Sequence, residues 1–332
     1  MKILGIETSC DETSASIVEN GTKIISNIVF SSQEMHAKTG GIIPENAARQ
    51  QIKSIIPVLE NSVKKTNFDA IAVTVGPGLI GSLLVGVETA RTLSYVYKKP
   101  IIPVNHLVAH IYANFIEKTE LPKFPYICLV VSGGHTDLIL MKNLKSIKYL
   151  GGTRDDAAGE AFDKTARLLG LPYPGGPSIS LKAKEHSNND LSLFPRPMIH
   201  DKNFEFSFSG LKTSVFRKVK DLKMTNSLQS KFAAEVQEAI VDVLISKTLS
   251  ALDKYKPKSL LLAGGVSANQ RLRYKLTKEI QDKKVKVDLF FPETKYCTDN
   301  AAVTASCAFF NRKYTPWEKI KVNPELTIID KV

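Results

Sequence analysis

Two histidines one helical turn apart are the sharpest chemical signal in the sequence. His106 and His110 stand four residues apart, directly after the short apolar run 101–104. Residues i and i+4 share one face of an α-helix, so both imidazoles can bind one metal ion. The same spacing also arises by coincidence or from hydrogen-bonded histidines in a core. The pair predicts a metal site only if further ligands lie near it.

A carboxylate stands at a matching place late in the chain. Asp299 lies in segment 298–300, where a second apolar helix is expected to begin. If the two helix starts face each other across a cleft between two lobes, two histidines and one carboxylate form a site with open coordination positions. Asp299 is equally suited to capping the N-terminus of its own helix.

Short turns rich in Ser, Thr and Gly are candidates for binding phosphate. Turns at 8–14 and 132–136 each join two strand-like runs, and their small residues let backbone N–H groups approach an anion. Segment 264–269 follows a buried strand and opens a helix, with Ser267 as the expected N-cap. Any one of these turns is also typical of an ordinary chain reversal. The matching positions of the first two favour phosphate binding.

The middle of the chain combines acids with a glycine-rich loop. Segment 155–166 carries four acids and one lysine on an expected helix, and residues 173–177 form a loop of Pro and Gly. Acids near a nucleotide bind ribose hydroxyls or metal, and a glycine-rich loop admits a flat base or sugar. Each acid alone is equally compatible with a solvated helix face.

These segments fall into one order of elements that occurs twice. Strand hairpin, strand, glycine turn, helix, strand and helix follow one another from residue 3 and again from residue 126. This order predicts an α/β fold with two duplicated lobes, of the actin, Hsp70 and sugar-kinase type. We expect one lobe over 1–120, completed by 310–332, and the other over 121–309. Two unrelated doubly wound domains are the alternative.

Composition limits the function classes. The 332 residues are 43% hydrophobic, which supplies a core, and no apolar run approaches the roughly 18 residues that span a bilayer. The start of the chain shows no signal or transit peptide, and four scattered cysteines suggest reduced thiols. We therefore expect a soluble cytoplasmic protein, or a mitochondrial one if the chain is organellar.

The net charge of +12 suits a protein that handles nucleic acid, although a lysine-rich composition alone gives the same excess. Basic residues gather in two groups, either of which is a candidate for contact with a polyanion or an ordinary solvated helix face. The first group is Lys212, Arg217, Lys218, Lys220 and Lys223, and the second is Lys254, Lys256 and Lys258.

With these motifs in order, the chain resembles the TsaD family of tRNA N6-adenosine threonylcarbamoyltransferases, in its bacterial or organellar branch. The resemblance covers nearly the full length. The motifs that carry it lie at 5–13, 76–79, 106–110, 131–136, 155–163, 206–213, 263–269 and 297–300.

The resemblance implies roles for individual residues. His106, His110 and Asp299 match the ligands of one divalent metal, usually taken as Fe²⁺, with Zn²⁺ as the other choice. A second set matches the substrate-binding positions: Val130, Val131, Ser132, Gly133, Gly134, Asp163, Gly176 and Asn269. No general base is identified, and His135 is only a candidate. Where the family leads us to expect a histidine shortly after Glu45, this chain has Gln51.

The implied reaction moves a threonylcarbamoyl group from threonylcarbamoyl-AMP to N6 of adenosine 37 in tRNAs that read codons beginning with A. TsaB-like and TsaE-like partner proteins are implied as well. An ATP-dependent small-molecule kinase of the same fold is the alternative. A metalloprotease is disfavoured because Leu107 and Val108 stand where HExxH places its general base. A non-catalytic ATPase module of the Hsp70 type is the last alternative, since no peptide-binding domain follows.

Overall fold

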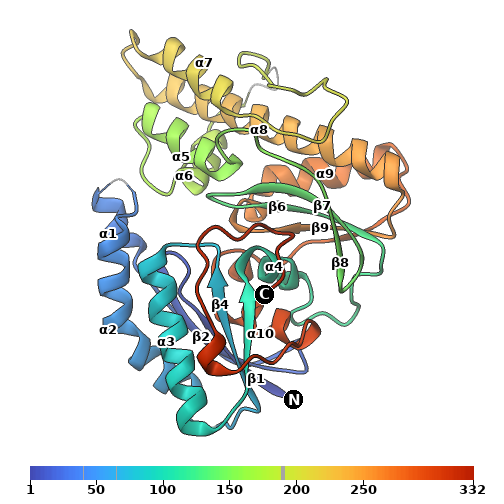
Figure 1. Cartoon of the computed structure of the whole chain (residues 1–332). Helices are drawn as coiled ribbons and strands as arrows, with labels where there is room; N and C mark the ends of the chain where they lie inside the picture. The colour runs from blue at the N-terminus through green and yellow to red at the C-terminus, as the bar shows by residue number, and fades with distance from the viewer. Residues whose placement is uncertain (40, 65, 188–190) are drawn as a thin grey trace. The chain divides into compact units, whose positions relative to one another are not determined.

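The computed structural model describes residues 1–39, 41–64, 66–187 and 191–332, and its chain folds as two compact units (Figure 1). Unit 1 comprises Met1–Leu121 and Pro292–Val332, and unit 2 comprises Pro122–Phe291. The expected boundary at 309 therefore differs from the structure, which places residues 292–309 with the N-terminal unit. All four cysteines lie within the described part and are free thiols. No helix there is long and apolar enough to cross a membrane.

Unit 1 is built on a five-stranded mixed sheet in the order β3-β2-β1-β4-β5. Its strands are β1 Lys2–Glu7, β2 Glu12–Glu19, β3 Lys23–Ser31, β4 Ala70–Gly76 and β5 Ile101–Asn105. Strands β1, β2 and β3 pair antiparallel, whereas β4 pairs parallel with β1 and with β5. Every residue of β4 is buried, as expected of a central strand with helices on both faces.

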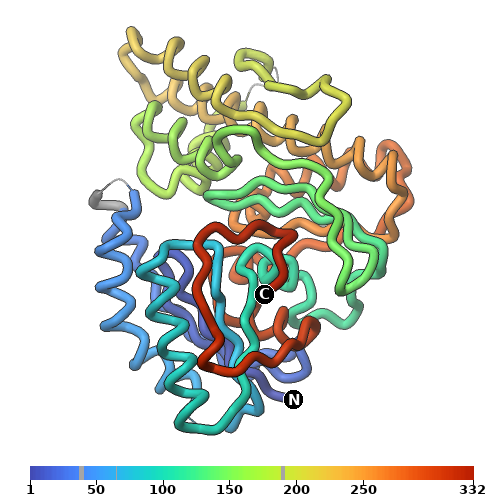
Figure 2. The backbone as a smooth tube through the Cα atoms, in the orientation of Figure 1, coloured from blue at the N-terminus to red at the C-terminus, as the bar shows by residue number. Residues whose placement is uncertain are grey.

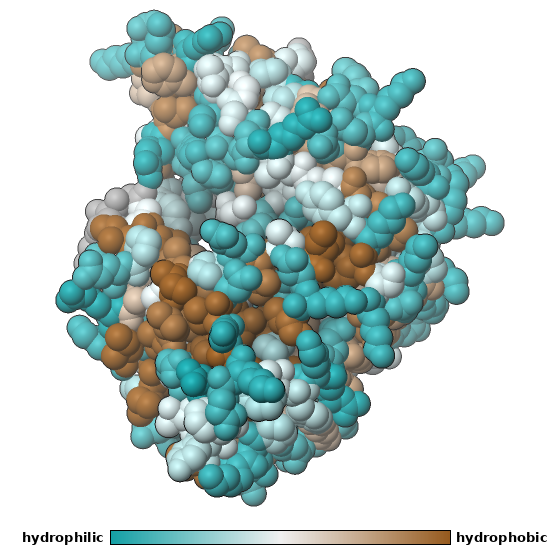
Figure 3. Space-filling model, viewed as in Figure 1, coloured by the Kyte–Doolittle hydropathy of each residue, from teal (hydrophilic) through white to brown (hydrophobic). Residues whose placement is uncertain are grey.

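Helices cover this sheet. They are α1 Gln33–Thr39, α2 Pro44–Val63, α3 Ile80–Tyr97, α4 His106–Ile111 and α10 Ala301–Phe310, with short 3-10 turns at Tyr112–Asn114, Thr294–Tyr296 and Trp317–Lys319. Helices α2 and α3 pack against each other, and α2 covers β2 while α3 covers β4. Several large apolar side chains on these two helices remain exposed: Ile52, Ile56, Ile80, Leu84 and Val96. Brown, hydrophobic areas are visible on the part of the surface where these helices lie (Figure 3).

Close packing explains why α10 belongs to unit 1. A Cβ on Gly5 of β1 would lie 2.2 Å from the Ala301 carbonyl oxygen, so only glycine lets the helix start approach this strand. The Ser14 hydroxyl on β2 also accepts the Ala301 N–H at 2.9 Å. After α10 the chain runs back along unit 1, where Asn323 N–H donates to the Val75 carbonyl (Figure 2).

Unit 2 repeats the sheet topology of unit 1, with the order β10-β9-β6-β7-β8. Its strands are β6 Tyr126–Val131, β7 Thr136–Asn143, β8 Ser146–Gly152, β9 Ser259–Ala263 and β10 Asp288–Phe290. Strands β6, β7 and β8 pair antiparallel, and β9 pairs parallel with β6 and with β10. The predicted duplication is therefore confirmed, and the structure adds a third antiparallel strand to the hairpin of each unit, β3 in unit 1 and β8 in unit 2.

The helices of unit 2 are α5 Ala158–Leu168, α6 Gly175–Ala183, α7 Ser209–Val219, α8 Asn226–Tyr255 and α9 Gln270–Asp282, with a 3-10 turn at Gly265–Ala268.

Three predictions from the sequence are corrected by the structure of unit 2. Asp155 and Asp156 precede α5 rather than lying on it, because the helix starts only at Ala158. Gly175 and Gly176 form the first turn of α6 rather than a loop. Asn269, not Ser267, caps α9 by accepting the Leu272 N–H.

Candidate functional site

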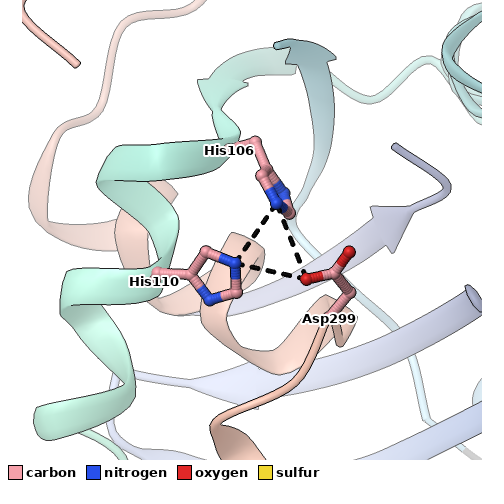
Figure 4. A group of neighbouring side chains, drawn as sticks. All are labelled: His106, His110 and Asp299. Carbon is pink, nitrogen blue, oxygen red and sulfur yellow. Dashed lines mark hydrogen bonds and ion pairs between the residues drawn. The ribbon is translucent and has the colours of Figure 1, made fainter. Parts of the chain in front are cut away.

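The two histidines and Asp299 converge within unit 1 (Figure 4). Nε2 of His106 lies 3.2 Å from Nε2 of His110, and Oδ1 of Asp299 lies 3.6 Å and 3.2 Å from these two nitrogens. One ligand atom from each residue thus lies within 4.8 Å of the other two. All three ligands come from unit 1, whereas the sequence led us to expect the carboxylate from the second lobe.

Asparagine caps hold the two helix starts so that the ligand side chains are left available. Asn105 Oδ1 accepts N–H groups of Leu107 and Val108 at the start of α4, which places His106 and His110 on one face of the first turn. Asn300 Oδ1 accepts N–H groups of Ala302 and Val303 at the start of α10. Because Asn300 is the cap, Asp299 is not consumed by capping and points at the histidines.

A buried carboxylate orients His106 from behind. Glu7, at the end of β1, is fully buried, and its Oε2 lies 3.3 Å from His106 Nδ1 and accepts the Thr74 hydroxyl at 2.5 Å. Its Oε1 accepts the Ser9 N–H at 2.7 Å. A proton on Nδ1, facing Glu7, leaves the lone pair on Nε2 directed toward His110 and Asp299. Such carboxylate–histidine contacts fix the tautomer of metal-binding histidines.

The electrostatics suit a cation. Burial opposes protonation of His106, yet the Asp299 and Glu7 carboxylates raise its pKa to about 9. Burial, followed by Asp299 and Asp11, also raises the pKa of Glu12 well above its usual range. These directions show an excess of negative charge around the cluster. Nδ1 of His110 is buried without a hydrogen-bond partner in the described part of the chain. Two imidazoles and one carboxylate in this setting fit a divalent transition metal.

Glu7→Gln is expected to lower metal affinity by about 10- to 100-fold while the ligands remain in place. The amide keeps the size of the side chain but loses the charge that holds the Nδ1 proton. Metal binding is measured by competition of the metal-free protein with a chelator. Glu117→Gln is the control, since Glu117 accepts the Tyr296 hydroxyl elsewhere in unit 1. Equal affinities in the two variants would contradict the orienting role.

Gln51, found where a histidine was expected, is fully buried and ties down the first hairpin loop. Its Nε2 lies 3.3 Å, 3.0 Å and 3.0 Å from the carbonyl oxygens of Thr8, Cys10 and Glu12. The amide therefore joins α2 to this loop through backbone carbonyl groups. Thr8 directly follows Glu7, so the contact with its carbonyl also connects α2 with the region of the histidines.

The predicted substrate residues lie in unit 2, around the β6–β7 turn. The Ser132 N–H donates to the His135 carbonyl at 2.8 Å, and Ser132 Oγ accepts the His135 N–H at 3.2 Å. A Cβ on Gly133 or Gly134 would meet no atom within 4 Å, so the backbone of both residues is open to a ligand. The side chains of Val130 and Val131 are fully buried, which leaves only their backbone for such contact.

Contacts between helices connect this turn with the other substrate residues. The Gly159 N–H on α5 donates to the Ser132 carbonyl at 3.2 Å. One turn along the same face of α5, Asp163 accepts the Gly175 N–H at 2.7 Å. Burial raises the pKa of Asp163, although its hydrogen bond from Gly175 opposes that shift. These contacts join the β6–β7 turn, α5 and the first turn of α6 into one contiguous set of residues, which we call the lining of the proposed substrate site.

Two residues of this lining, Ser180 and Gln237, were not indicated by any pattern in the sequence. Asn269 Nδ2 donates to Ser180 Oγ at 3.0 Å and to Gln237 Oε1 at 3.1 Å, and Ser180 Oγ donates to the same Gln237 oxygen at 2.8 Å. Ser180 lies one turn after Gly176 on α6, so this cluster extends the lining to α9. Gln237 is one polar residue among many on the long helix α8, and only the tertiary structure reveals its position.

Gln237→Leu is expected to weaken binding of AMP about tenfold, because it removes the acceptor that fixes both Asn269 and Ser180. Gln237→Glu keeps an acceptor oxygen at the position of Gln237 Oε1 and should retain most of the affinity. Calorimetry gives the affinity, and thermal melts show whether each variant is folded. If the leucine variant is folded and binds AMP as the glutamate variant does, Gln237 has no positioning role.

Comparison with known proteins assigns the chain to a family. Residues 23–306 match the family model of tRNA N6-adenosine threonylcarbamoyltransferase. The chain belongs to this family. A Syntrophomonas wolfei tRNA N6-adenosine threonylcarbamoyltransferase is 49% identical over 323 residues, covering 95% of this chain and 94% of the relative. A Listeria welshimeri protein of the same name is 47% identical, covering 99% and 97%. The sequence-based family assignment is confirmed.

Solved structures confirm the fold class of this threonylcarbamoyltransferase family member. Full-length HypF, in a phosphate- and nucleotide-bound form, matches with a TM-score of 0.60 and 12% identity over 93% of this chain and 46% of HypF. Component A of Acidaminococcus fermentans (R)-2-hydroxyglutaryl-CoA dehydratase matches with a TM-score of 0.54 and 15% identity over 94% and 98%. Identities this low show a shared fold of the actin and sugar-kinase type.

Proposed function

We propose that the chain transfers a threonylcarbamoyl group from threonylcarbamoyl-AMP to N6 of adenosine 37 in tRNAs that read ANN codons. Similarity to curated tRNA N6-adenosine threonylcarbamoyltransferases over nearly the whole chain carries this proposal. The N6 amine attacks the carbamoyl carbon and forms a new C–N bond. The C–O bond to the phosphate breaks, AMP leaves with the electron pair, and N6 releases one proton.

In this proposal unit 2 binds the adenylate. Backbone N–H groups of Gly133 and Gly134 donate to its phosphate and stabilise the charge that develops as AMP departs. The Ser132 N–H instead holds the turn through the His135 carbonyl. Open space beside Gly176 and the neighbouring Asp163 supports a place for the nucleoside. Both donor hydrogens of the Asn269 side chain are engaged within the protein, so its role is to hold α9 and α6 together around the nucleoside.

Unit 1 holds a divalent metal ion through His106, His110 and Asp299 in the same proposal. Fe²⁺ is the ion that we propose, and Zn²⁺ is compatible with the same ligand set. When bound, such an ion supplies Lewis acidity and an anchor for an oxygen of the substrate. Glu7 keeps the proton on His106 Nδ1, and Gln51 fixes the loop next to it. His135 remains the candidate for taking the N6 proton, since it closes the turn that contains Gly133 and Gly134.

The partners proposed with this activity are the tRNA substrate and TsaB-like and TsaE-like proteins, in the cytoplasm. No observation favours the kinase alternative, because the sugar-kinase neighbours share the fold alone. A reconstituted assay tests the activity: AMP release and the modified nucleoside in digested tRNA are measured together. Both should require tRNA and threonylcarbamoyl-AMP, and a tRNA with guanosine at position 37 should give neither. AMP release without nucleoside modification, or phosphorylation of a small substrate by ATP, would overturn the proposal.

A further inference from the structure

A lysine-lined pocket lies in unit 2, apart from the proposed adenylate site. It encloses about 620 Å³ where α8 and α9 end and β10 approaches. Its lining contains four lysines and a single acid, Asp253, a surplus of three positive charges. The lysines are Lys256, Lys283, Lys284 and Lys286, and the remaining lining is mainly serine and aliphatic side chains.

The lysines are available to an incoming anion. Lys256 pairs with Asp253 at 2.5 Å and Lys283 with Glu279 at 3.0 Å, but all four side chains are largely or partly exposed. Exposed pairs of this kind contribute little stability and exchange readily for other partners. Within the described part of the chain, Lys284 and Lys286 have no acidic partner. Aliphatic residues of the pocket let lysine stems cover apolar surface while their ammonium groups stay in water.

Two of these lysines occupy backbone conformations that favour glycine. Lys256 ends α8 with φ of 43°, and Lys284 follows α9 with φ of 51°. Residues in this left-handed region at helix C-termini are usually glycine, because a Cβ is strained there. Each helix end thus carries a lysine in the pocket at a position where glycine would avoid the backbone strain. Lysines near helix C-termini are also favoured there by the helix dipoles.

The pocket is too far from the adenylate residues for a mononucleotide to reach both. Helix α9 runs from its cap at Asn269 to Asp282, just before Lys283, and its thirteen residues span about 20 Å. Strand β9 likewise begins beside the pocket, after Pro257, and ends at Ala263, which pairs with Val130 before the substrate turn. The pocket therefore lies at the opposite end of strand β9 from the substrate turn.

From this distance and this charge, we infer that the pocket binds the sugar-phosphate backbone of the tRNA substrate, away from the modified nucleotide. The inference rests on the proposed function, which supplies a polyanion long enough to reach it. Of the two basic groups of the sequence, the second contributes Lys256 to the lining of the pocket, and the first contributes no residue to it.

The left-handed lysines permit a test that does not threaten the fold. Lys256→Gly and Lys284→Gly remove charge and relieve backbone strain at once, so neither change should lower stability. Lys98→Gly is the matched control: Lys98 ends α3 of unit 1 with φ of 53° and stacks on Tyr95, outside the pocket. Affinity for tRNA is measured at several salt concentrations in the reconstituted system, together with AMP affinity.

Each lost phosphate contact should reduce the slope of log affinity against log salt by about one, and weaken binding about fivefold to tenfold near 0.1 M salt. The double variant should show up to twice that change in slope, with unchanged AMP affinity and a higher KM for tRNA. Equal tRNA affinity and slope in the double variant and Lys98→Gly would overturn the inference, as would an equal loss of AMP affinity. If wild type modifies no tRNA, the proposed function itself fails, and the two failures are thus distinguished.

Discussion

Purified wild-type protein is expected to carry about one divalent transition metal ion per chain, and His110→Ala to lose it. His110 supplies one of three converging ligand atoms, and its side chain is almost fully buried. An alanine leaves only two of these three ligands in place. Metal content after purification is measured by inductively coupled plasma mass spectrometry. Activity in the reconstituted assay should fall by roughly 100-fold or more, since metal catalysis contributes several kcal/mol.

His200→Ala serves as the control, because His200 is exposed and belongs to unit 2. It should keep the metal content and the activity of wild type. His106→Ala and Asp299→Asn should resemble His110→Ala in metal content, since each removes a ligand from the same cluster. Full metal retention by both histidine variants would exclude the site, whatever their activity. A folded variant is confirmed by its thermal melt.

At the metal site, residue spacing predicts the histidine pair but not the origin of the third ligand. The four-residue spacing of His106 and His110 predicts a shared helix face, and the structure confirms that face. The contribution of Asp299 from the same unit was not predictable from sequence order. It depends on α10 packing onto β1, where Gly5 admits the Ala301 carbonyl. That contact joins residues almost three hundred positions apart.

Strand topology was more accessible from the sequence than helix boundaries. Buried strands and glycine turns recur in the same order in both halves, so the duplicated sheet could be predicted. The start of a helix was harder to predict, because more than one residue nearby could serve as its N-cap. Ser267 and Asn269 are both good capping residues, and only the position of Leu272 N–H shows that Asn269 is the cap. The cis peptide before Pro174 and the helix start at Gly175 were likewise hidden in a run that resembles a loop.

Gly176→Val is expected to abolish binding of AMP and its analogues, by at least about 100-fold, while leaving the protein folded. A Cβ at Gly176 meets no protein atom within 4 Å, so the added side chain extends into open space. That space is the proposed place of the nucleoside, beside Asp163 and one turn before Ser180. The valine must therefore clash with the ligand and with nothing else. Calorimetry measures the affinity, and the melting temperature should equal that of wild type or lie slightly above it, because valine has a higher helix propensity than glycine.

The neighbouring glycine provides the control that separates lost binding from lost folding. A Cβ on Gly175 would lie 2.5 Å from the Cα of Asp163, in the tight contact between α5 and α6. Gly175→Val should therefore lower the melting temperature, as overpacking typically costs 1–3 kcal/mol or more. The two variants differ by one position and carry the same side chain, yet one should fail in binding and the other in stability. Wild-type affinity for AMP in a folded Gly176→Val protein would place the nucleoside elsewhere in unit 2.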